Sequence, residues 1–576
     1  MPWQLSKEAQ QWVEDTLASM SLREKIGQTM QDHAGRLPVG GRDEDGLKAY
    51  LEQYPVGSFF IGGEVIQRAA GKAGDYREWA ELLQRLSRIP LLFSGDLEFG
   101  AGSAVRSLTD LPPLLALAAA DDEQLAYEYG KFTAIEGRAA GFTWALAPGT
   151  DLLLNWMNPV ITTRCLGDDP ERAARLAAAV VRGMQEHGLA ACAKHFPGDG
   201  VDCRDQHIVT TVNSLSEEEW LATYGQVTRS LIERGVWTIM TGHIALPWIE
   251  GPEEGRPVPA TVSQRITTEL LRTKLGFGGV VLSDALDMGG FLMWGDYERR
   301  IIDCFNAGTD VLLWPGVRYF GTMERALRDG SVTMERLDDS VRRVLRLKAG
   351  LGLQHLDEGG RDPQAALLSN DRLLPEQDAQ ARTLSRILAE RCVTLVRNRG
   401  NLLPLDPQKT RRVLVIKLNK VTEGRRYDRM DRFIALLQAR GITVDILDEF
   451  EPLNTVWKWE QAGARWDAAF APFFMPLHGM MNTARPVGEA AKAVWAMQHA
   501  ETIRPIGISF ATPYLLRDIP FLDALINAYS LHEDTMEVLI SALFGELPFR
   551  GLSPVQAEEV QLKDEPGGVN SANQQA

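Results

Sequence analysis

The sequence predicts an α/β protein in which a closed (β/α)8 barrel is followed by a smaller α/β sandwich domain. With 576 residues the chain is too long for one ordinary hydrophobic core, so two domains are expected. Short apolar runs alternate with longer helical patterns between about residues 50 and 315, as in strand–helix repeats. Polar residues follow several of these runs, and the carboxyl ends of barrel strands are where functional groups collect.

The expected barrel strands are continuous apolar runs, which indicates that both of their faces are buried. They recur roughly every 25 to 50 residues, which leaves room for a helix after each strand. An open doubly wound sheet would give the same pattern, and the polar strand ends favour the barrel. The runs are residues 56–61, 91–94, 143–147, 190–193, 237–241, 280–283 and 311–314.

The domain boundaries follow from changes in composition along the chain. Residues 1–358 are predicted to form the barrel domain, and residues 359–384, which open on Gly-Gly-Arg-Asp-Pro, a linker. Residues 385–555 are predicted to form the second domain, and the polar residues 556–576 a disordered tail. The strands expected in the second domain are residues 392–396, 413–417, 442–447, 468–474 and 505–509.

Composition excludes several classes of function. The formal net charge of −16 disfavours a nucleic acid partner. No run of 18 apolar residues occurs, so no membrane span is expected, and the N-terminal residues lack the pattern of a signal peptide. The five cysteines are scattered without a C-x-x-C pair, which fits a reduced, cytoplasmic location. The glycines of residues 95–102 do not form the dinucleotide fingerprint, and no cofactor is predicted.

Asp284 ends the otherwise apolar strand at residues 280–283. A carboxylate at a barrel mouth can attack the anomeric carbon of a sugar as a nucleophile. Asp is also a favoured helix N-cap, so Asp284 could instead cap a helix that starts near Ala285. The polar segments at other strand ends favour the catalytic interpretation.

Asp205 and His207 are two residues apart on a loop that follows the strand at 190–193. An aspartate beside a histidine holds one tautomer of the imidazole and stabilises its protonated form, which suits a general acid/base. The alternative is a solvated loop with no role in catalysis. His195, Asp199, Cys203 and His207 are also of metal-ligand type, but the intervening Pro and Gly residues argue against a helix that would gather them, and no metal is predicted.

Other polar residues near strand ends are candidates for binding sugar hydroxyls. Lys194 and His195 end a buried strand, and a buried lysine is rare unless it is paired. Asp96 follows the strand at 91–94, and Arg164 precedes a helix expected to begin near Pro170. Ion pairs with purely structural roles are the alternative, for example Arg164 with Asp168. Among the 14 tryptophans, Trp144, Trp237 and Trp314 are expected in the core, and Trp248 and Trp294 could line a site.

Taken together, these motifs resemble glycoside hydrolase family 3, particularly its β-N-acetylglucosaminidase branch. The similar segments are Met-Ser-Leu-Arg-Glu-Lys-Ile-Gly-Gln at 20–28, Lys-His-Phe-Pro-Gly at 194–198, and Ser283-Asp284. The segments at 393–398 and 402–405 resemble the start of the family's second domain.

The resemblance implies a retaining, two-step mechanism in which Asp284 is the nucleophile and the Asp205–His207 pair is the acid/base. It also implies sugar-binding roles for Asp96, Arg106, Arg164, Lys194 and His195. The β-glucosidase branch takes its acid/base from a glutamate of the second domain. Two features depart from the β-N-acetylglucosaminidase pattern: residues 97–104 differ from Asp-x-Glu-Gly-Gly, and Asp199 replaces a histidine.

The expected function is therefore an exo-acting β-N-acetylhexosaminidase that acts on a β-linked saccharide or muropeptide-like fragment, and a cytoplasmic location would suit cell wall recycling. Alternatives are a β-glucosidase or an N-acetylglucosaminide phosphorylase on the same scaffold. Phosphate is a candidate acceptor because a histidine that has given up its proton is neutral and repels an anion less than a carboxylate does. A non-catalytic sugar-binding protein or a nucleotide-binding enzyme on an open sheet are further alternatives.

Overall fold

The computed structural model describes residues 4–37, 43–62, 73–358, 373–418, 428–447, 455–475, 479–480, 483–487 and 504–557, with the single positions 491, 494 and 497. The chain divides into two compact units. The first comprises Met1–Ala389 together with the short segment Leu477–Ala484. The second comprises Glu390–Pro476 and Arg485–Ala576. The sequence did not indicate that residues near 480 would belong to the barrel unit.

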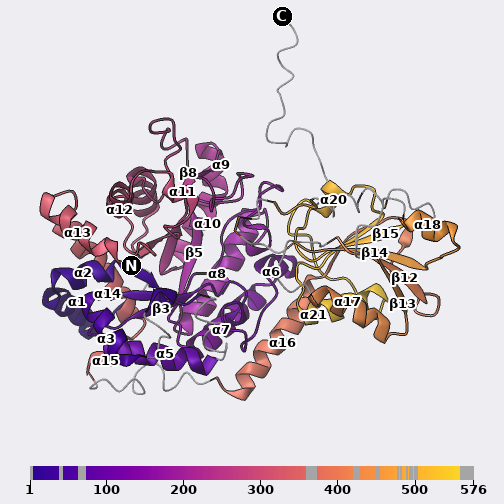
Figure 1. The fold of residues 1–576 in the computed structure, drawn as a ribbon, viewed down its shortest axis with the longest axis horizontal. Coiled ribbons are helices and arrows are strands. Elements are labelled where there is room, and N and C mark those ends of the chain that lie inside the picture. Colours follow the sequence, from indigo (N-terminus) through magenta and orange to yellow (C-terminus); the bar gives the residue numbers. More distant parts are fainter. Residues whose placement is uncertain are drawn as a thin grey trace, which may run out of the picture. The chain divides into compact units, whose positions relative to one another are not determined.

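The first unit is an eight-stranded parallel barrel with helices around it (Figure 1). The strand order is β10-β1-β2-β3-β4-β5-β7-β9, and a parallel bridge between Leu282 and Val311 joins the two ends of this order. The predicted barrel is therefore confirmed. Its strands are β1 (Met30–His33), β2 (Ser58–Phe60), β3 (Leu92–Gly95), β4 (Trp144–Ala145), β5 (Ala190–Phe196), β7 (Thr238–Thr241), β9 (Val280–Ser283) and β10 (Leu312–Leu313).

The sequence predicted seven of these strands and missed β1. Its central residues Gln31 and Asp32 are polar, yet both are fully buried. Tyr50 donates a hydrogen bond to Asp32, so the burial of this carboxylate is compensated by a polar partner. A strand with two buried polar residues does not form the apolar run by which the other seven are recognised.

Helices follow most barrel strands, and several begin with the side-chain caps that their sequences predict. α8 has Pro170 at its first position and Asp169 as its N-cap, which confirms the expected start of this helix. The helices are α1 (Lys7–Ser19), α2 (Leu22–Gln28), α3 (Glu44–Gln53), α5 (Ala73–Leu86), α6 (Leu114–Ala120), α7 (Glu123–Ala139), α8 (Pro170–Glu186), α9 (Glu217–Ala222), α10 (Tyr224–Glu233), the π-helix η5 (Arg265–Lys274), α11 (Gly289–Leu292), α12 (Tyr297–Asn306), α13 (Arg318–Asp329), α14 (Met334–Gly350), α15 (His355–Glu358) and α16 (Pro375–Cys392).

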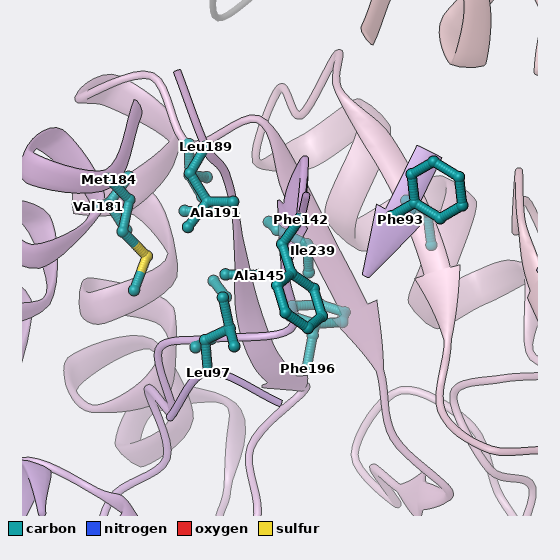
Figure 2. Packing of buried hydrophobic residues seen from close by; sticks show 14 of the residues in the cluster. Phe93, Leu97, Phe142, Ala145, Val181, Met184, Leu189, Ala191, Phe196 and Ile239 are labelled. Atoms are coloured by element: carbon teal, nitrogen blue, oxygen red, sulfur yellow. The ribbon is translucent and has the colours of Figure 1, made fainter. Parts of the chain in front are cut away.

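The core of the first unit lies between the strands and the helices that cover them. Figure 2 shows Val181 and Met184 of α8 beside Leu189 and Ala191, at the start of β5. All four side chains are at most 2% exposed. Burial of each large apolar side chain contributes about 1.5–3 kcal/mol, so this packing fixes β5, the strand that leads into the predicted acid/base loop.

The second unit is a six-stranded sheet with helices on both faces. Its strand order is β11-β16-β15-β14-β12-β13, parallel except for the β11–β16 pair. α17 and α21 lie together on one face (Figure 1), and residues of α18 and α20 pack in a cluster on the other. The sequence missed β16. The elements are β11 (Thr394–Asn398), β12 (Arg412–Ile416), α17 (Asp428–Ala439), β13 (Thr443–Leu447), α18 (Thr455–Gln461), β14 (Ala468–Phe473), β15 (Pro505–Ser509), α20 (Leu515–Asp518), β16 (Ala524–Asn527) and α21 (Glu533–Leu543).

The region predicted as a linker is helical in its last part. α16 begins at Pro375, so residues 375–384 are helical, and residues 359–372 lie outside the described part of the chain. Of the predicted tail at 556–576, only residues 556 and 557 are described.

A buried cluster of charges around Asp310 links β9 to η5 and α14. The carboxylate of Asp310 is fully buried and accepts hydrogen bonds from Arg272 Nη2 at 2.5 Å, Arg343 Nη1 at 3.1 Å and the backbone N–H of Val281 at 3.0 Å. Burial alone would raise the pKa of Asp310, but the charges of Arg272 and Arg343 outweigh it and lower the pKa. The position of β9, and with it that of Asp284, therefore depends on this ion cluster.

We expect Asp310→Asn to destabilise the barrel unit by about 3 kcal/mol or more, because it leaves buried arginines without their counter-charge. Since the native pKa of Asp310 is lowered, the loss should be largest near neutral pH and should shrink as the pH falls through that pKa. Urea unfolding at several pH values measures it. The exposed residue Glu269, on the same helix as Arg272, provides the control Glu269→Gln. A loss equal to that of the control would contradict the role given to Asp310.

Candidate active site

A cavity of about 380 Å³ opens at the carboxyl ends of the barrel strands in the first unit. Its volume lies in the range of small-molecule sites. Its polar lining residues come from β3, β5 and β9 or the loops that follow them, and from the loop before α8. They are Asp96, Arg164, Lys194, His195, Gln206, His207, Asp284 and Asp287. The remaining lining residues, all apolar or aromatic, are Phe60, Leu146, Met240, Ala285, Met288, Leu313, Trp314 and Met480.

Asp284 follows β9 and presents its carboxylate to this cavity. Its backbone N–H donates to the carbonyl of Thr241 at 2.9 Å, and its Oδ1 accepts from the N–H of Ala285 at 2.8 Å. Its other oxygen, Oδ2, lies 3.8 Å from His195 Nε2. Burial would raise the pKa of Asp284, but the charges of His195 and His243 outweigh burial and lower it. The result is an ionised carboxylate at the cavity wall.

His195 supplies the positive charge beside Asp284. Its Nδ1 lies 2.8 Å from Oδ2 of Asp151, and its backbone N–H donates to the same carboxylate. Burial alone would lower the pKa of His195, but the negative charge and hydrogen bond of Asp151 raise it. Asp151 thus holds the imidazole in one orientation and favours its protonated form. This role of Asp151 was not predicted from the sequence.

Asp205 and His207 form the pair that their spacing predicts. His207 Nδ1 lies 2.7 Å from Asp205 Oδ1, and the His207 backbone N–H donates to the same oxygen at 2.8 Å. The side chain of Asp205 is 1% exposed, whereas that of His207 is 29% exposed and lines the cavity. With Nδ1 facing Asp205, Nε2 is the nitrogen available to a substrate.

Two glycines direct the chain from β5 into the loop that carries this pair. Gly198 and Gly200 have φ angles of 117° and 104°, which other residues rarely adopt. A Cβ on Gly200 would lie 1.9 Å from the carbonyl oxygen of Leu152, so there is no room for a side chain. The glycines that argued against a helix in this loop are therefore required by the turn itself.

Further along the same loop, Asp199 and Gln206 link it to neighbouring strands. Gln206 Nε2 donates to Asp199 Oδ2 at 3.2 Å, and Gln206 Oε1 accepts from the N–H of His243. Asp199 is buried, and its backbone N–H donates to Asp151 Oδ1 at 2.7 Å. Burial, together with the nearby Asp151 carboxylate, raises the pKa of Asp199. These bonds join the loop to Asp151, which follows β4, and to His243, which follows β7.

Lys194 and Arg164 meet at the buried carboxylate of Glu98. Arg164 donates to both oxygens of Glu98 at 2.7 Å, and Lys194 Nζ lies 2.5 Å from Glu98 Oε1. Lys194 also lies 3.0 Å from Asp96, whose side chain is 54% exposed. Burial would raise the pKa of Glu98, but Arg164 and Lys194 lower it. The network fixes two cations and the free oxygen of Asp96 at the cavity wall, an arrangement suited to sugar hydroxyls.

Of the eight predicted site residues, six line the cavity, Asp205 binds His207 beside it, and Arg106 lies elsewhere. Arg106 lies in an exposed turn after residues 101–103 and does not line the cavity. Glu98, which was not predicted as a site residue, lies beside Lys194. The signal that could have found it is its position two residues after Asp96, which matches the glutamate of the Asp-x-Glu pattern. Arg164 pairs with Glu98, a partner that was not predicted.

The tryptophan expectations were partly wrong. Trp144 and Trp237 are buried as expected. Trp314 was expected in the core, but it lines the cavity and packs edge-on against Phe60, with ring centroids 5.0 Å apart. Trp248 and Trp294 do not line this cavity. Strand β10 ends at Leu313, so Trp314 is already at the barrel mouth, a boundary that the apolar run at 311–314 conceals.

Two further features of the described residues bear on other functions. Within that part of the chain, no group of three or more His, Cys, Asp or Glu side chains is arranged to hold a metal ion. In the same residues, no helix combines the length and the apolar character needed to cross a membrane.

Comparisons with known proteins agree with the geometry. Residues 21–347 match the model of the glycosyl hydrolase family 3 N-terminal domain. The chain belongs to glycoside hydrolase family 3. It is 33% identical over 581 residues to a beta-N-acetylglucosaminidase/beta-glucosidase of Cellulomonas fimi, covering 96% of this chain and 97% of that protein. This family membership confirms the expected resemblance and makes the chain a glycoside hydrolase.

Two solved structures are similar to the family 3 chain over nearly its whole length. One is the beta-glucoside phosphorylase BglX bound to 2FGlc, with a TM-score of 0.85, 31% identity, and coverage of 96% of this chain and 97% of that one. The other is a family 3 beta-N-acetylglucosaminidase from Paenibacillus sp. str. FPU-7, with a TM-score of 0.78, 25% identity, and coverage of 94% and 100%. The names of these relatives therefore include N-acetylglucosaminidase, glucosidase and phosphorylase.

The charge beside Asp284 leads to a prediction for the pH dependence of this glycoside hydrolase. His195→Gln removes the positive charge that lowers the pKa of Asp284, while burial, which raises it, remains. The pKa of Asp284 should rise, so a larger fraction of the carboxylate is protonated at a given acid pH. We expect the acid limb of kcat/KM for an aryl β-glycoside to move to higher pH, measured between about pH 3 and pH 7. A limb that stays in place, or moves to lower pH, would contradict the role assigned to His195.

Proposed function

We propose that the chain is a retaining, exo-acting β-glycosidase that releases terminal β-linked N-acetylglucosamine through a covalent glycosyl intermediate on Asp284. One observation carries this proposal: an ionised strand-end carboxylate, an imidazole paired with a buried aspartate, and two cations, buried Lys194 and partly buried Arg164, surround one cavity. A non-catalytic sugar-binding protein would need the cations and Asp96, but it would not need Asp284 together with an Asp–His pair.

In the first step, Asp284 attacks C1 of the sugar while His207 Nε2 gives its proton to the leaving oxygen. The glycosidic C–O bond breaks, the aglycone leaves as an alcohol, and a glycosyl ester forms on Asp284. In the second step, neutral His207 takes a proton from water, which attacks C1 and releases Asp284. Asp205 stabilises the protonated imidazole before the first step and after the second.

The rest of the cavity supports sugar binding. Lys194, Arg164 and Asp96 offer donors and an acceptor for hydroxyl groups. Trp314 and Phe60 offer apolar surface for the face of the ring. The Cellulomonas fimi relative is named for both N-acetylglucosaminidase and glucosidase activity, and Asp199 departs from the branch pattern, so we propose β-glucosides as a second substrate class. We propose cell wall fragments in the cytoplasm as the natural substrates.

Asp284→Asn should reduce kcat/KM for an aryl β-N-acetylglucosaminide on the order of 10³-fold or more, because the amide is not a nucleophile for C1. The substitution keeps the shape of the side chain, so thermal unfolding should change little. Glu269→Gln, which lies away from the cavity, is the control for loss of one negative charge. Near-normal turnover by Asp284→Asn would remove the proposed nucleophile.

Phosphorolysis is a second candidate, and the identity of the acid/base favours it. After His207 has protonated the leaving group it is neutral, so an anionic acceptor meets less repulsion than it would beside a glutamate. Similarity to the β-glucoside phosphorylase over 96% of the chain supports the same candidate. Phosphate would attack C1 of the glycosyl intermediate, breaking the bond to Asp284 and giving a sugar 1-phosphate.

We expect added inorganic phosphate to increase turnover of an aryl β-glycoside whose deglycosylation is slow, with sugar 1-phosphate as product. Chromatography or ³¹P NMR separates this product from the free sugar. His207→Glu is the matched variant: it keeps an acid/base but leaves a negative charge after the first step, so phosphate should stimulate it less. Free sugar as the sole product at saturating phosphate would exclude phosphorolysis.

A further inference from the structure

Two residues that follow the barrel by more than a hundred positions in the sequence lie at the acid/base pair. Gly479 and Met480 belong to the segment Leu477–Ala484, which is part of the first unit although it is far from the barrel in sequence. The backbone N–H of Met480 donates to Asp205 Oδ2 at 2.6 Å, and Met480 lines the cavity. Neither glycine nor methionine has a side chain that could act as acid, base or nucleophile in the proposed reaction.

The Met480 hydrogen bond completes the coordination of the Asp205 carboxylate. Oδ1 accepts from His207 Nδ1 and from the His207 backbone, and Oδ2 accepts from Met480. Because the Asp205 side chain is only 1% exposed, solvent has little access to Oδ2. Without the Met480 N–H, Oδ2 of this buried carboxylate would lose a hydrogen bond, and the carboxylate could rotate away from His207.

Gly479 lies against the flat face of the His207 ring. A Cβ on Gly479 would lie 2.7 Å from Nε2 and 2.8 Å from both Cδ2 and Cε1. Three nearly equal distances place this position above the ring plane, because a position beyond the tip of the ring would be much closer to Nε2 than to the two carbons. The glycine backbone therefore lies over one face of the imidazole, away from the in-plane direction in which Nε2 would give a proton to a substrate.

Space, not backbone conformation, requires glycine at this position. The φ angle of Gly479 lies outside the left-handed region, so alanine could adopt the same backbone. Contacts below 3.0 Å are essentially never made by real Cβ atoms, so an added methyl group must displace the imidazole or the segment itself.

We propose that Gly479 and Met480 are positioning residues for the acid/base: the Met480 N–H fixes the Asp205 carboxylate, and the Gly479 backbone holds the His207 ring with Nε2 facing the leaving oxygen. This rests on the proposed function, in which His207 is the acid/base. Burial would raise the pKa of Asp205, but hydrogen bonds from His207 and Met480 are among the effects that lower it. Asp205 thus stays ionised, holds the Nδ1 proton, and leaves Nε2 to exchange protons with the substrate.

Gly479→Ala tests this role through the dependence on the leaving group. A methyl β-glycoside needs protonation of its leaving oxygen, whereas a 2,4-dinitrophenyl β-glycoside, with a good leaving group, does not. We expect kcat/KM to fall about 10²-fold for the methyl glycoside and much less for the dinitrophenyl glycoside. Gly321→Ala on α13, where the nearest atom to an added Cβ is 3.6 Å away, is the matched control and should affect neither substrate. Equal losses on the two substrates would overturn the proposal.

The His207→Ala background separates positioning from a general effect on folding. Removing the ring makes room for the methyl group, so Gly479→Ala should change neither activity nor thermal unfolding further in that background. A further loss of either there would show that the methyl group acts on something other than His207, which overturns the proposal even if the single variant folds poorly. If His207→Ala itself shows no dependence on the leaving group, the acid/base assignment fails instead.

Discussion

The effect that contributes most to keeping Asp284 ionised comes from one buried pair, His195 with Asp151. A carboxylate buried at the end of β9 would gain a proton if burial acted alone. His195 Nε2, 3.8 Å away, opposes that effect, and it carries its charge because Asp151 binds Nδ1 at 2.8 Å. The charge of the proposed nucleophile therefore depends on Asp151, a carboxylate that is not among the residues lining the cavity. The same principle recurs at Glu98, whose carboxylate favours the charged forms of Lys194 and Arg164.

These charge pairs also explain why a barrel suits the chemistry. Lys194 and His195 are consecutive at the end of β5, and Asp284 ends β9, two places along in the strand order. β7 lies between them and offers the carbonyl of Thr241 to the Asp284 backbone. Parallel strands bring groups far apart in sequence to one edge. Loops then add the acid/base pair, whose position is fixed by glycines in tight turns and by backbone contacts rather than by further charges.

Much of this arrangement could be predicted from the sequence, because it is local. Continuous apolar runs identify seven barrel strands, and Asp205, His207 and Asp284 stand out as polar residues after such runs. β1 could not be found in this way, since its buried Gln31 and Asp32 interrupt the apolar pattern. Partners that act over long range were also missed: nothing near Asp151 in sequence points to His195, and the backbone of Met480 carries no sequence signal at all. The expectation for Trp314 failed for a related reason, because one residue decides between core and cavity at a strand end.

The central claim is that a covalent bond forms between the sugar and Asp284. Incubation with a 5-fluoro glycosyl fluoride of the 2-acetamido or gluco series should trap the glycosyl ester, because the fluorine slows both steps and the fluoride leaving group restores the first. Peptide mass spectrometry should then find one sugar on the peptide that contains Asp284. A label on another carboxylate, such as Asp96 or Asp287, or full turnover without any trapped species in wild type, would contradict this account.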